Sequence, residues 1–595
     1  MKDAQVFKPI PYGVADFFKI RQGHYYYVDK TRFIKNIEEK GNYLFFIRPR
    51  RFGKSLFLST LESYYDIAYK EDFDSIFKGT DIYNTPTETK NSFMILKMNF
   101  SKVDPSPDKV EDSFIEMVIN DFIFFVTRYK KYLDIDKNAA ISRIQSQKSA
   151  ADVLNTLITL CKEKEHRLYI IIDEYDNFAN TILSEAGESE FKKITHGSGF
   201  LRAFFYVLKA GTSDSNAPIS RLFMTGVSPI TLDDVTSGFN IASSISLDTD
   251  LNEMLGFTQA DVEEMIEYYR QTGKIVHSTH ELMEIMCQWY NHYKFSVRGV
   301  TELYNTDQVL YFMQEYMKES LIPGNLVDRN ARIDYGKLHH LIIIDQEGVP
   351  GTNGNFSKLR EIMENGEIHS DIETGFPIDE IANPANFVSL LYYFGLLTIR
   401  GLDDENTPVL TIPNELVKQL YYDYISKTYK ETGILSIDSN KYKELIKGMA
   451  FRGNWKEAVE YISGRMSGSL SISDLLSGEK AHQVFWNVYL GLNTLYCVHP
   501  EKEMNQGYAD LVLEPVLANN PGIKFSYIIE IKYIKPTEYE KEGIEGKIES
   551  LRKEGESQLI QYGRDDKFLK TIGQTTLKKL ILIFSGNRLV YSGEV

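Results

Sequence analysis

The chain has 595 residues, of which 43% are hydrophobic and 13% aromatic. Because this length exceeds what one hydrophobic core can serve, we expect two to four domains. The formal net charge of −16 argues against a protein that coats nucleic acid with its whole surface, although it permits a local basic channel. Three cysteines, Cys161, Cys287 and Cys497, lie too far apart for a zinc-ligand cluster or a disulfide framework.

The N-terminal residues 1–5 lack the apolar core of a secretory signal. The longest apolar stretches, such as 390–399, are too short to cross a bilayer. These features predict a soluble cytoplasmic protein without a membrane partner.

An aromatic strand pattern at 45–47 leads through a basic turn to Gly53-Lys54-Ser55, which opens a segment with helical spacing of apolar residues. A helix N-terminus presents unpaired backbone N–H groups and a positive dipole end, so it suits a polyphosphate. Lys54 would reach the β- and γ-phosphates, and the Ser55 hydroxyl would hold Mg²⁺. The predicted nucleotide-binding residues of this loop are Arg48, Pro49, Arg50, Arg51, Phe52, Gly53, Lys54, Ser55 and Leu56.

The loop departs from the usual phosphate-loop pattern because Arg48 stands where that pattern has its first glycine. Arg48, Arg50 and Arg51 would add positive charge beside the phosphates. The alternative is an ordinary basic loop that precedes an amphipathic helix.

A second apolar run, 168–172, ends in Asp173-Glu174, as expected of a central parallel strand whose carboxyl end faces a ligand crevice. In a nucleoside triphosphatase, Asp173 would hold the Mg²⁺ water shell and Glu174 would polarise the attacking water. The alternative is a buried strand that ends in a solvated acidic turn. Thr225 or Ser228, at the end of a further strand pattern, would sense the γ-phosphate unless they form a simple turn.

From about residue 250 the pattern becomes helical. Residues 386–414 then follow the order helix, strand, polar turn and strand, and another helix comes after them, which suggests a winged-helix module. Winged helices often bind DNA, but the turn at 403–406 is acidic, so we expect this module to pack against the ATPase core.

Near the C-terminus, Asp510 begins one predicted strand, and Glu530 and Lys532 lie two residues apart on another, so both project from one sheet face. Two carboxylates beside a lysine predict a divalent-metal site. Asp510, Glu530 and the Ile531 carbonyl would bind Mg²⁺, while Lys532 positions or deprotonates the attacking water. The alternative for Glu530 and Lys532 is a cross-strand ion pair.

The last helical segment places Gln558 and Tyr562 four residues apart, on one face suited to a nucleic-acid backbone. Residues 521–595 carry 13 Lys and Arg against 11 Asp and Glu, so this end is nearly neutral in an acidic chain. That balance permits phosphodiester binding but does not require it.

Six segments together resemble a bacterial AAA-ATPase-like family whose members carry a C-terminal nuclease domain of the PD-(D/E)XK superfamily. They are residues 27–31, 48–55, 172–176, 225–228, 289–295 and 391–398. The resemblance implies an α/β multidomain fold. Its parts are a P-loop AAA/STAND-like parallel-sheet ATPase core (1–250), a helical lid and winged-helix region (251–470) and a restriction-endonuclease-like domain (471–595).

The resemblance also implies roles for single residues. Arg48 becomes a normal variant of this family's phosphate loop, and Asp510, Glu530 and Lys532 match the nuclease motif. Gln558 and Tyr562 match a Gln-x-x-x-Tyr helix, and Glu479 is the candidate for a further metal-orienting acid.

These features predict an ATP- and Mg²⁺-dependent protein in which nucleotide binding governs cleavage of nucleic acid, most simply DNA, in defence or mobile-DNA handling. Two alternatives stay open: a non-catalytic, ATP-regulated scaffold that grips DNA, and a sensor of a protein or peptide. A homo-oligomer is compatible with the sequence. No arginine finger is assigned, and Arg202 and Arg221 are candidates by proximity alone.

Overall fold

The structure is a computed structural model, and it describes most of the chain. The described residues are 7–213, 216–230, 241–328, 358–359, 361–362, 365–380, 383–421, 438–467, 479–505, 507–517, 520–539 and 544–595. Two compact units divide the chain. The first contains Met1–Leu321, Val327–Ile362 and Gly366–Asn414, and the second contains Ile322–Leu326, Met363–Asn365 and Glu415–Val595. The division into three domains stays a prediction.

The first unit is built on a five-stranded parallel sheet with the strand order β2-β3-β4-β1-β5. Its strands are β1 (Tyr43–Ile47), β2 (Met94–Asn99), β3 (Leu168–Asp173), β4 (Ile219–Gly226) and β5 (Ser243–Ser244). Every residue of β3 is buried, because helices cover both faces of a parallel sheet. The predicted parallel-sheet core is confirmed.

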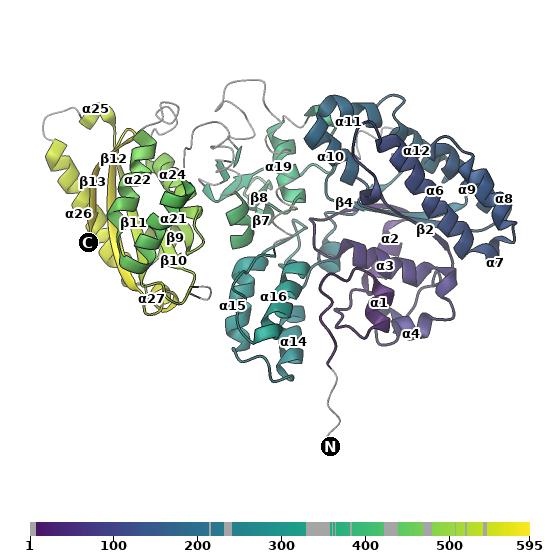
Figure 1. Ribbon diagram of the computed structural model, residues 1–595, viewed down its shortest axis with the longest axis horizontal. Coiled ribbons are helices and arrows are strands. Elements are labelled where there is room, and N and C mark those ends of the chain that lie inside the picture. The colour runs from purple at the N-terminus through teal and green to yellow at the C-terminus, as the bar shows by residue number, and fades with distance from the viewer. Residues whose placement is uncertain are drawn as a thin grey trace, which may run out of the picture. The chain divides into compact units, whose positions relative to one another are not determined.

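Helices lie on both faces of this sheet (Figure 1). On one face are α2 (Phe33–Lys40) and α3 (Lys54–Tyr65), and on the other are α6 (Val110–Arg128), α9 (Ala150–Glu163) and α12 (Phe200–Ala210). The further helices of the unit that have described bounds are α1 (Phe17–Gln22), α4 (Phe73–Phe77), α5 (Asp81–Asn84), α7 (Lys130–Leu133), α8 (Lys137–Gln145), α10 (Asn177–Ala186), α11 (Glu188–Thr195), α14 (Gln259–Arg270), α15 (Thr279–Tyr290), α16 (Thr306–Glu319) and α19 (Pro384–Tyr393).

The predicted strand, loop and helix around Gly53 are present. β1 ends at Ile47, α3 begins at Lys54, and Gly53 caps the helix with a φ of 97°. Glycine enters this left-handed region without the strain that a side chain brings. β1 pairs with β4, which pairs with β3, so the carboxyl ends of these strands bring the loop, Asp173 and Thr225 to one edge of the sheet.

The predicted order of helix, strand, turn and strand is seen over residues 384–411, and a further helix begins at residue 415; the winged-helix assignment itself stays a prediction. Helix α19 is followed by β7 (Thr398–Leu402), a turn and β8 (Pro408–Thr411). A further strand, β6 (Glu367–His369), comes before α19 in the chain and pairs with β8, which gives a three-stranded antiparallel sheet with the order β6-β8-β7. The turn after α19 packs on the phosphate loop, because a Cβ built on Gly395 would lie 2.8 Å from the Pro49 Cβ. The expected packing against the ATPase core is therefore seen.

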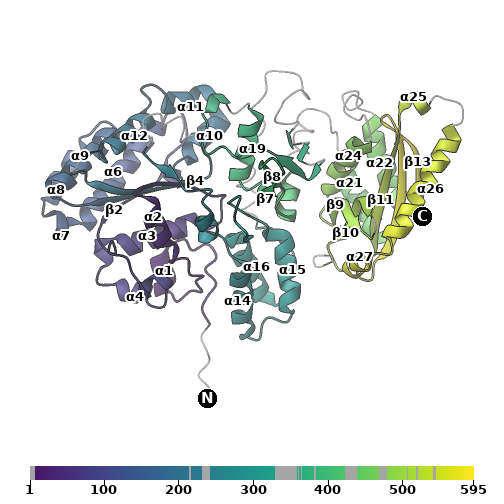
Figure 2. The same cartoon turned by 180° about the vertical axis from the view of Figure 1, so that it is seen from behind.

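The second unit contains a five-stranded mixed sheet with the order β13-β12-β11-β10-β9, in which only β11 and β12 are parallel neighbours. Its strands are β9 (Tyr496–Met504), β10 (Gly507–Pro515), β11 (Phe525–Ile534), β12 (Thr576–Ser585) and β13 (Arg588–Glu594). Helices α21 (Ser439–Lys447), α22 (Trp455–Ser467) and α24 (Glu479–Gly491) lie on one face, and α26 (Ile544–Tyr562) lies on the other (Figures 1 and 2). The unit also contains two short helices, α25 (Pro536–Tyr539) and α27 (Asp566–Thr571), and a π-helical segment, Gly448–Arg452.

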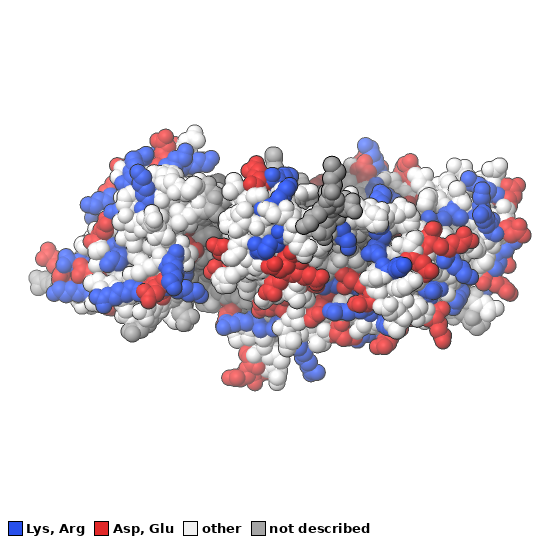
Figure 3. Space-filling view, turned by 90° about the horizontal axis from the view of Figure 1, so that it is seen from below, with Lys and Arg blue, Asp and Glu red and all other residues white. Residues whose placement is uncertain are grey.

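The exterior reflects the mixed charge of the chain. Lys and Arg side chains alternate with Asp and Glu side chains over much of the face drawn in Figure 3. Among the described residues, no helix is both long enough and apolar enough to cross a membrane.

Gly395 offers a test of the packing behind the phosphate loop. Its φ is 75°, so Gly395→Ala introduces left-handed strain of about 1–2 kcal/mol and also pushes a methyl group against Pro49. The matched control is Gly79→Ala, because Gly79 has a φ of 84° and open space around its Cα. We expect a larger loss of thermal stability for Gly395→Ala, measured by differential scanning fluorimetry. Equal losses would contradict the close approach.

Candidate nucleotide and metal sites

The first candidate site lies where the phosphate loop meets the end of β3. The Ser55 Oγ donates a hydrogen bond to the Asp173 Oδ2 at 2.6 Å. The Asp173 Oδ1 is buried and has no hydrogen-bond partner among the described residues. A hydroxyl and a partly unsatisfied carboxylate are ligands that suit Mg²⁺, so the residues present fit a hydrated magnesium ion at this position.

Lys54 lies inside the loop that precedes its helix. Its Nζ donates to the carbonyl oxygens of Arg48, at 2.8 Å, and Pro49, at 2.9 Å. Burial lowers the pKa of Lys54 to about 8, against the opposing effect of nearby carboxylates, of which Glu174 is the strongest. A buried ammonium held only by neutral carbonyls is well placed to gain from an anionic ligand.

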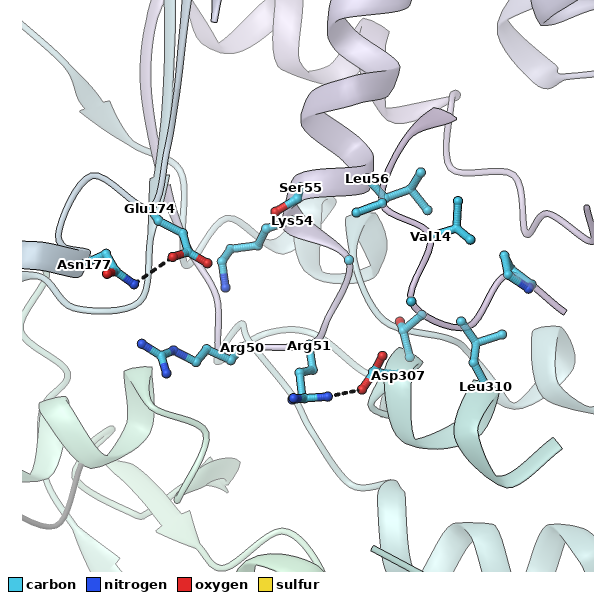
Figure 4. A pocket seen from close by; sticks show the side chains of 15 residues that line it. Val14, Arg50, Arg51, Lys54, Ser55, Leu56, Glu174, Asn177, Asp307 and Leu310 are labelled. Atoms are coloured by element: carbon cyan, nitrogen blue, oxygen red, sulfur yellow. Dashed lines mark hydrogen bonds and ion pairs between the residues drawn. The ribbon is translucent and has the colours of Figure 1, made fainter. Parts of the chain in front are cut away.

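A cavity of about 440 Å³ opens beside the loop. Figure 4 shows the basic side chains and Glu174 around one part of it, and Val14 and Leu310 at another. Its lining residues are Pro11, Gly13, Val14, Ala15, Arg50, Arg51, Gly53, Lys54, Ser55, Leu56, Glu174, Asn177, Thr306, Asp307 and Leu310. The volume suits a small-molecule ligand, with polar groups for phosphates and apolar groups for a base.

The backbone of Glu174 adopts an unfavourable conformation. Its φ is 49°, in the left-handed region, and the Asn177 Nδ2 donates to its Oε2 at 2.7 Å (Figure 4). Burial raises the pKa of Glu174. The sequence prediction missed Asn177, although its position three residues after Glu174, in the first turn of a helix, was an available signal.

The three arginines of the loop, Arg48, Arg50 and Arg51, have different surroundings. Arg48 is buried, and its guanidinium donates to the carbonyl oxygens of Ile47, at 3.0 Å, Ser246 and Leu251. The expectation that its charge lies beside the phosphates is therefore corrected: the side chain points into the interior. The side chains of Pro49 and Phe52 likewise do not line the cavity.

Arg51 lines the cavity but forms ion pairs with Asp307 and, at 2.8 Å, with Asp328 (Figure 4). The sequence prediction missed both acids, which lie more than 250 residues away in the chain. Arg50 lines the same cavity. Arg202 and Arg221 do not line it, so neither gains support as an arginine finger from this cavity.

Thr225 lies in β4, opposite Phe46 of the strand that leads into the loop. Its Oγ1 is buried and has no hydrogen-bond partner in the described part of the chain. The Ser228 Oγ differs from it, because it accepts the Ile230 backbone N–H at 3.3 Å. The γ-phosphate role of Thr225 stays a prediction.

The second candidate site lies in the other unit, on β10 and β11. These strands pair with Leu511 opposite Ile529, and the same register places Asp510 opposite Glu530. The Asp510 Oδ2 accepts the Ile531 backbone N–H at 2.6 Å, and the Lys532 Nζ lies 2.9 Å from the Glu530 Oε1. Asp510, Glu530 and Lys532 are all buried. The structure thus brings together the three residues that the sequence singled out.

The electrostatics of this cluster favour a bound cation. Burial and the neighbouring Glu530 raise the pKa of Asp510, and burial raises that of Glu530. The Glu530 Oε2 has no hydrogen-bond partner among the described residues. Glu479, at the start of α24, acts electrostatically on Asp510, Glu530 and Lys532, so it lies near them. Two close buried carboxylates with an unsatisfied oxygen fit a divalent ion.

Side chains of the described residues alone do not supply all the ligands of a divalent ion at Asp510 and Glu530. Within the described ranges, no group of three or more His, Cys, Asp and Glu side chains is placed to hold a metal ion. A cation here would therefore need further oxygen ligands besides Asp510 and Glu530, from water or from the backbone, such as the predicted Ile531 carbonyl.

Gln483 is a site neighbour that the sequence prediction missed. Its Nε2 donates to the Asp510 Oδ1 at 2.8 Å, and both groups are buried. The available signal was its spacing, because Gln483 lies four residues after Glu479 on the same helix.

The helix α26 carries the two residues predicted to contact nucleic acid. The Tyr562 ring is 4% exposed and belongs to the hydrophobic core, so its ring does not offer an open surface. Burial and the nearby Glu530 and Asp510 raise the pKa of the Tyr562 hydroxyl, and Gln558 lies close enough to oppose this effect. Gln558 and Tyr562 thus lie beside the carboxylates, and their contact with a nucleic-acid backbone stays a prediction.

Two family models match this chain, and each match covers one of the two candidate sites. Residues 11–236 match the family model described as "Predicted AAA-ATPase", and residues 477–594 match the PD-(D/E)XK nuclease superfamily. The chain carries an AAA-ATPase-like domain and a PD-(D/E)XK nuclease superfamily domain. The first match contains the phosphate loop and Asp173, and the second contains Asp510, Glu530 and Lys532.

Individual relatives are distant. The chain is 28% identical over 328 residues to a protein of Azotobacter chroococcum mcd 1 described as "Uncharacterized protein in vnfD 5'region". The match covers 54% of this chain and 56% of that relative, so it spans little more than half of each.

Two solved structures show weak similarity over the chain. The Cdc6p structure from Pyrobaculum aerophilum is 11% identical with a TM-score of 0.26, over 68% of this chain and 92% of that one. The ORC2 protein of Aeropyrum pernix, in ADPNP and ADP complexes, is 10% identical with a TM-score of 0.30, over 67% and 93%.

The buried carboxylate pair predicts a stability test. Asp510→Asn removes a charge that burial and Glu530 disfavour, and the Gln483 amide can rotate to keep a hydrogen bond. We expect this variant to melt higher than the unaltered chain in EDTA, by about 2–4 °C for each kcal/mol gained. It should also lose any stabilisation by Mg²⁺ or Mn²⁺, measured by differential scanning fluorimetry.

The matched control is Glu514→Gln in the same sheet. Although burial opposes its ionisation, His499 and Lys502 lower the pKa of Glu514 to about 2. Removal of this paired charge should lower the melting temperature, whereas Asp510→Asn should raise it. A stability loss in EDTA for Asp510→Asn would contradict the unfavourable carboxylate pairing.

Proposed function

We propose that this protein binds and hydrolyses ATP and that nucleotide binding governs a Mg²⁺-dependent nuclease activity on nucleic-acid phosphodiesters. The observation that carries the proposal is the presence of two phosphate-chemistry sites in one chain. One is the phosphate loop with its Ser55–Asp173 contact, and the other is the buried cluster of Asp510, Glu530 and Lys532. DNA is the proposed substrate, and defence or mobile-DNA handling is the proposed setting.

At the nucleotide site, the free N–H groups at the start of α3 and the Lys54 ammonium would bind the β- and γ-phosphates. Bound Mg²⁺ would neutralise phosphate charge between Ser55 and Asp173. Glu174 would orient the attacking water once it leaves Asn177. The apolar residues Val14 and Leu310 would contact the base.

At the nuclease site, Asp510 and Glu530 would hold the divalent ion, which supplies electrostatic stabilisation of the phosphodiester transition state when bound. Lys532 would position the attacking water and balance the developing charge. Gln483 and the Ile531 N–H fix the orientation of Asp510. Gln558 and Tyr562 would contact the nucleic-acid backbone beside the cleaved bond.

Cleavage assays test the nuclease half. The purified chain should cut at least one form of DNA or RNA with Mg²⁺ or Mn²⁺, and the rate should change with ATP. Asp510→Asn should reduce cleavage by roughly 100-fold or more while DNA binding is retained, because the residue stabilises the transition state. Glu514→Gln, measured below its melting temperature, should keep the activity. No cleavage of any substrate by the unaltered chain would favour a non-catalytic scaffold.

Nucleotide binding and phosphate release test the ATPase half. Lys54→Ala should abolish ATP binding, measured by equilibrium titration. Glu174→Gln should keep binding but lower phosphate release by about 100-fold, as expected for loss of a group that activates water. Glu116→Gln, an exposed acid of α6, is the control for a single lost carboxylate. Equal hydrolysis by Glu174→Gln and the control would exclude this role for Glu174.

A further inference from the structure

Cys287, His292 and Glu302 form a chain of contacts outside both sites. The Cys287 Sγ lies 3.6 Å from the His292 Nε2, and the other ring nitrogen of His292 lies 2.7 Å from the Glu302 Oε2. The Asn291 Nδ2 also lies 3.6 Å from the Cys287 Sγ. A thiol, an imidazole and a carboxylate in this order are the arrangement that activates a sulfur nucleophile.

The geometry of this cluster is specific. His292 adopts a φ of 71°, a left-handed conformation that costs a non-glycine residue energy, and this conformation presents its ring to both partners. Cys287 and His292 are each partly exposed, and Glu302 is exposed, so a small reagent can approach the cluster. The contact with His292 lowers the pKa of Cys287, and the contact with Cys287 raises the pKa of His292 to about 9.

The other two cysteines differ from Cys287 both in burial and in the pKa of the thiol. Cys161 and Cys497 are buried. Burial raises the pKa of the Cys161 thiol to about 12 and raises that of Cys497 as well. Buried thiols of this kind are inert, whereas a partly exposed thiolate beside a cation reacts. Cys161 and Cys497 therefore serve as internal controls for the reactivity of Cys287.

We propose that Cys287 is a modification site that reacts with peroxides, with His292 and Glu302 as its positioning residues. The Cys287 thiolate attacks one oxygen of hydrogen peroxide, the S–O bond forms and the O–O bond breaks. The sulfur is oxidised to a sulfenic acid, and the leaving hydroxide takes a proton from the His292 imidazolium to give water.

The position of the cluster gives this reaction a consequence. His292 is followed by Tyr293, whose ring packs edge-on against Phe52 of the phosphate loop at a centroid distance of 4.9 Å. Oxidation converts the thiolate that contacts the His292 ring at 3.6 Å into a larger, uncharged group, so the attraction between Cys287 and the imidazolium is lost and we expect the imidazole to shift. We expect this shift to reach Tyr293 and weaken nucleotide binding, a step that rests on the proposed function.

Peroxide treatment of the reduced full-length chain, with a sulfenic-acid trap and peptide mass spectrometry, tests the site. We expect Cys287 to be labelled at least about 10-fold faster than Cys161 and Cys497. The His292→Asn variant separates activation from mere exposure, because asparagine tolerates the left-handed backbone but carries no charge. This variant should retain its melting temperature and lose most of the labelling rate.

The pH profile of alkylation by iodoacetamide gives a second readout. The titratable groups that act on the thiol or on its partners are His292, Glu302, Tyr304 and Glu263. Fast alkylation should persist at lower pH in the unaltered chain than in His292→Asn or Glu302→Gln. Equal rates and equal profiles in these proteins, or no preference for Cys287 over the two buried cysteines, would overturn the proposal.

Binding of a fluorescent ATP analogue tests the consequence. Peroxide should lower the affinity of the unaltered chain and leave that of Cys287→Ser unchanged. Unchanged affinity in both after complete labelling would exclude the link to the phosphate loop. A chain that binds no nucleotide before oxidation would instead overturn the proposed function, while the labelling rates still decide the reactivity of Cys287.

Discussion

The first unit depends on the burial of the Arg48 guanidinium behind the phosphate loop. A buried charge is costly unless its donors are satisfied. Here carbonyl oxygens of Ile47, Ser246 and Leu251 accept hydrogen bonds from its two terminal nitrogens, and the Phe46 and Phe295 rings cover it at 4.3 and 4.4 Å. Its Nε is buried and has no hydrogen-bond partner among the described residues. Burial lowers the pKa of Arg48 to about 10. In place of a flexible glycine, the loop has an anchor in the core.

Both candidate sites carry buried carboxylate oxygens that the protein leaves unsatisfied. Asp173 and Glu530 each have one such oxygen among the described residues, and each stands beside a group with which it could share a cation. The partly buried carboxylate of Glu514, in contrast, is paired with Lys502 at 2.6 Å. Asp121, outside both sites, also has an unsatisfied oxygen of this kind among the described residues, so this feature alone does not identify a ligand site. At Asp173 and Glu530 the oxygen lies beside a further ligand for a cation, the Ser55 hydroxyl in one case and the Asp510 carboxylate in the other, and a bound cation would remove the cost of the unsatisfied oxygen.

The sequence predicted local structure well and long-range contacts poorly. Continuous apolar runs identified β1 and β3, because both faces of a parallel strand are buried, and strand alternation placed Glu530 and Lys532 on one face. The orientation of Arg48 was not predictable, since its acceptors at Ser246 and Leu251 lie about 200 residues away. Asp328, the partner of Arg51, was missed for the same reason. Asn177 and Gln483, in contrast, lay one helical turn from predicted residues.

Two further segments of the chain support the phosphate loop by packing against it, although their own residues do not bind phosphate. Residues 289–295 supply Tyr293 and Phe295, whose rings pack edge-on against Phe52, and residues 391–398 supply Gly395 against Pro49. These supports come from outside the parallel sheet, yet they touch the residues on either side of Arg50 and Arg51. A change that moves either support must therefore move the loop, because closely packed interiors transmit displacement. The region after residue 250 is thus part of the nucleotide site in physical terms, although it contributes few residues to the lining of the cavity.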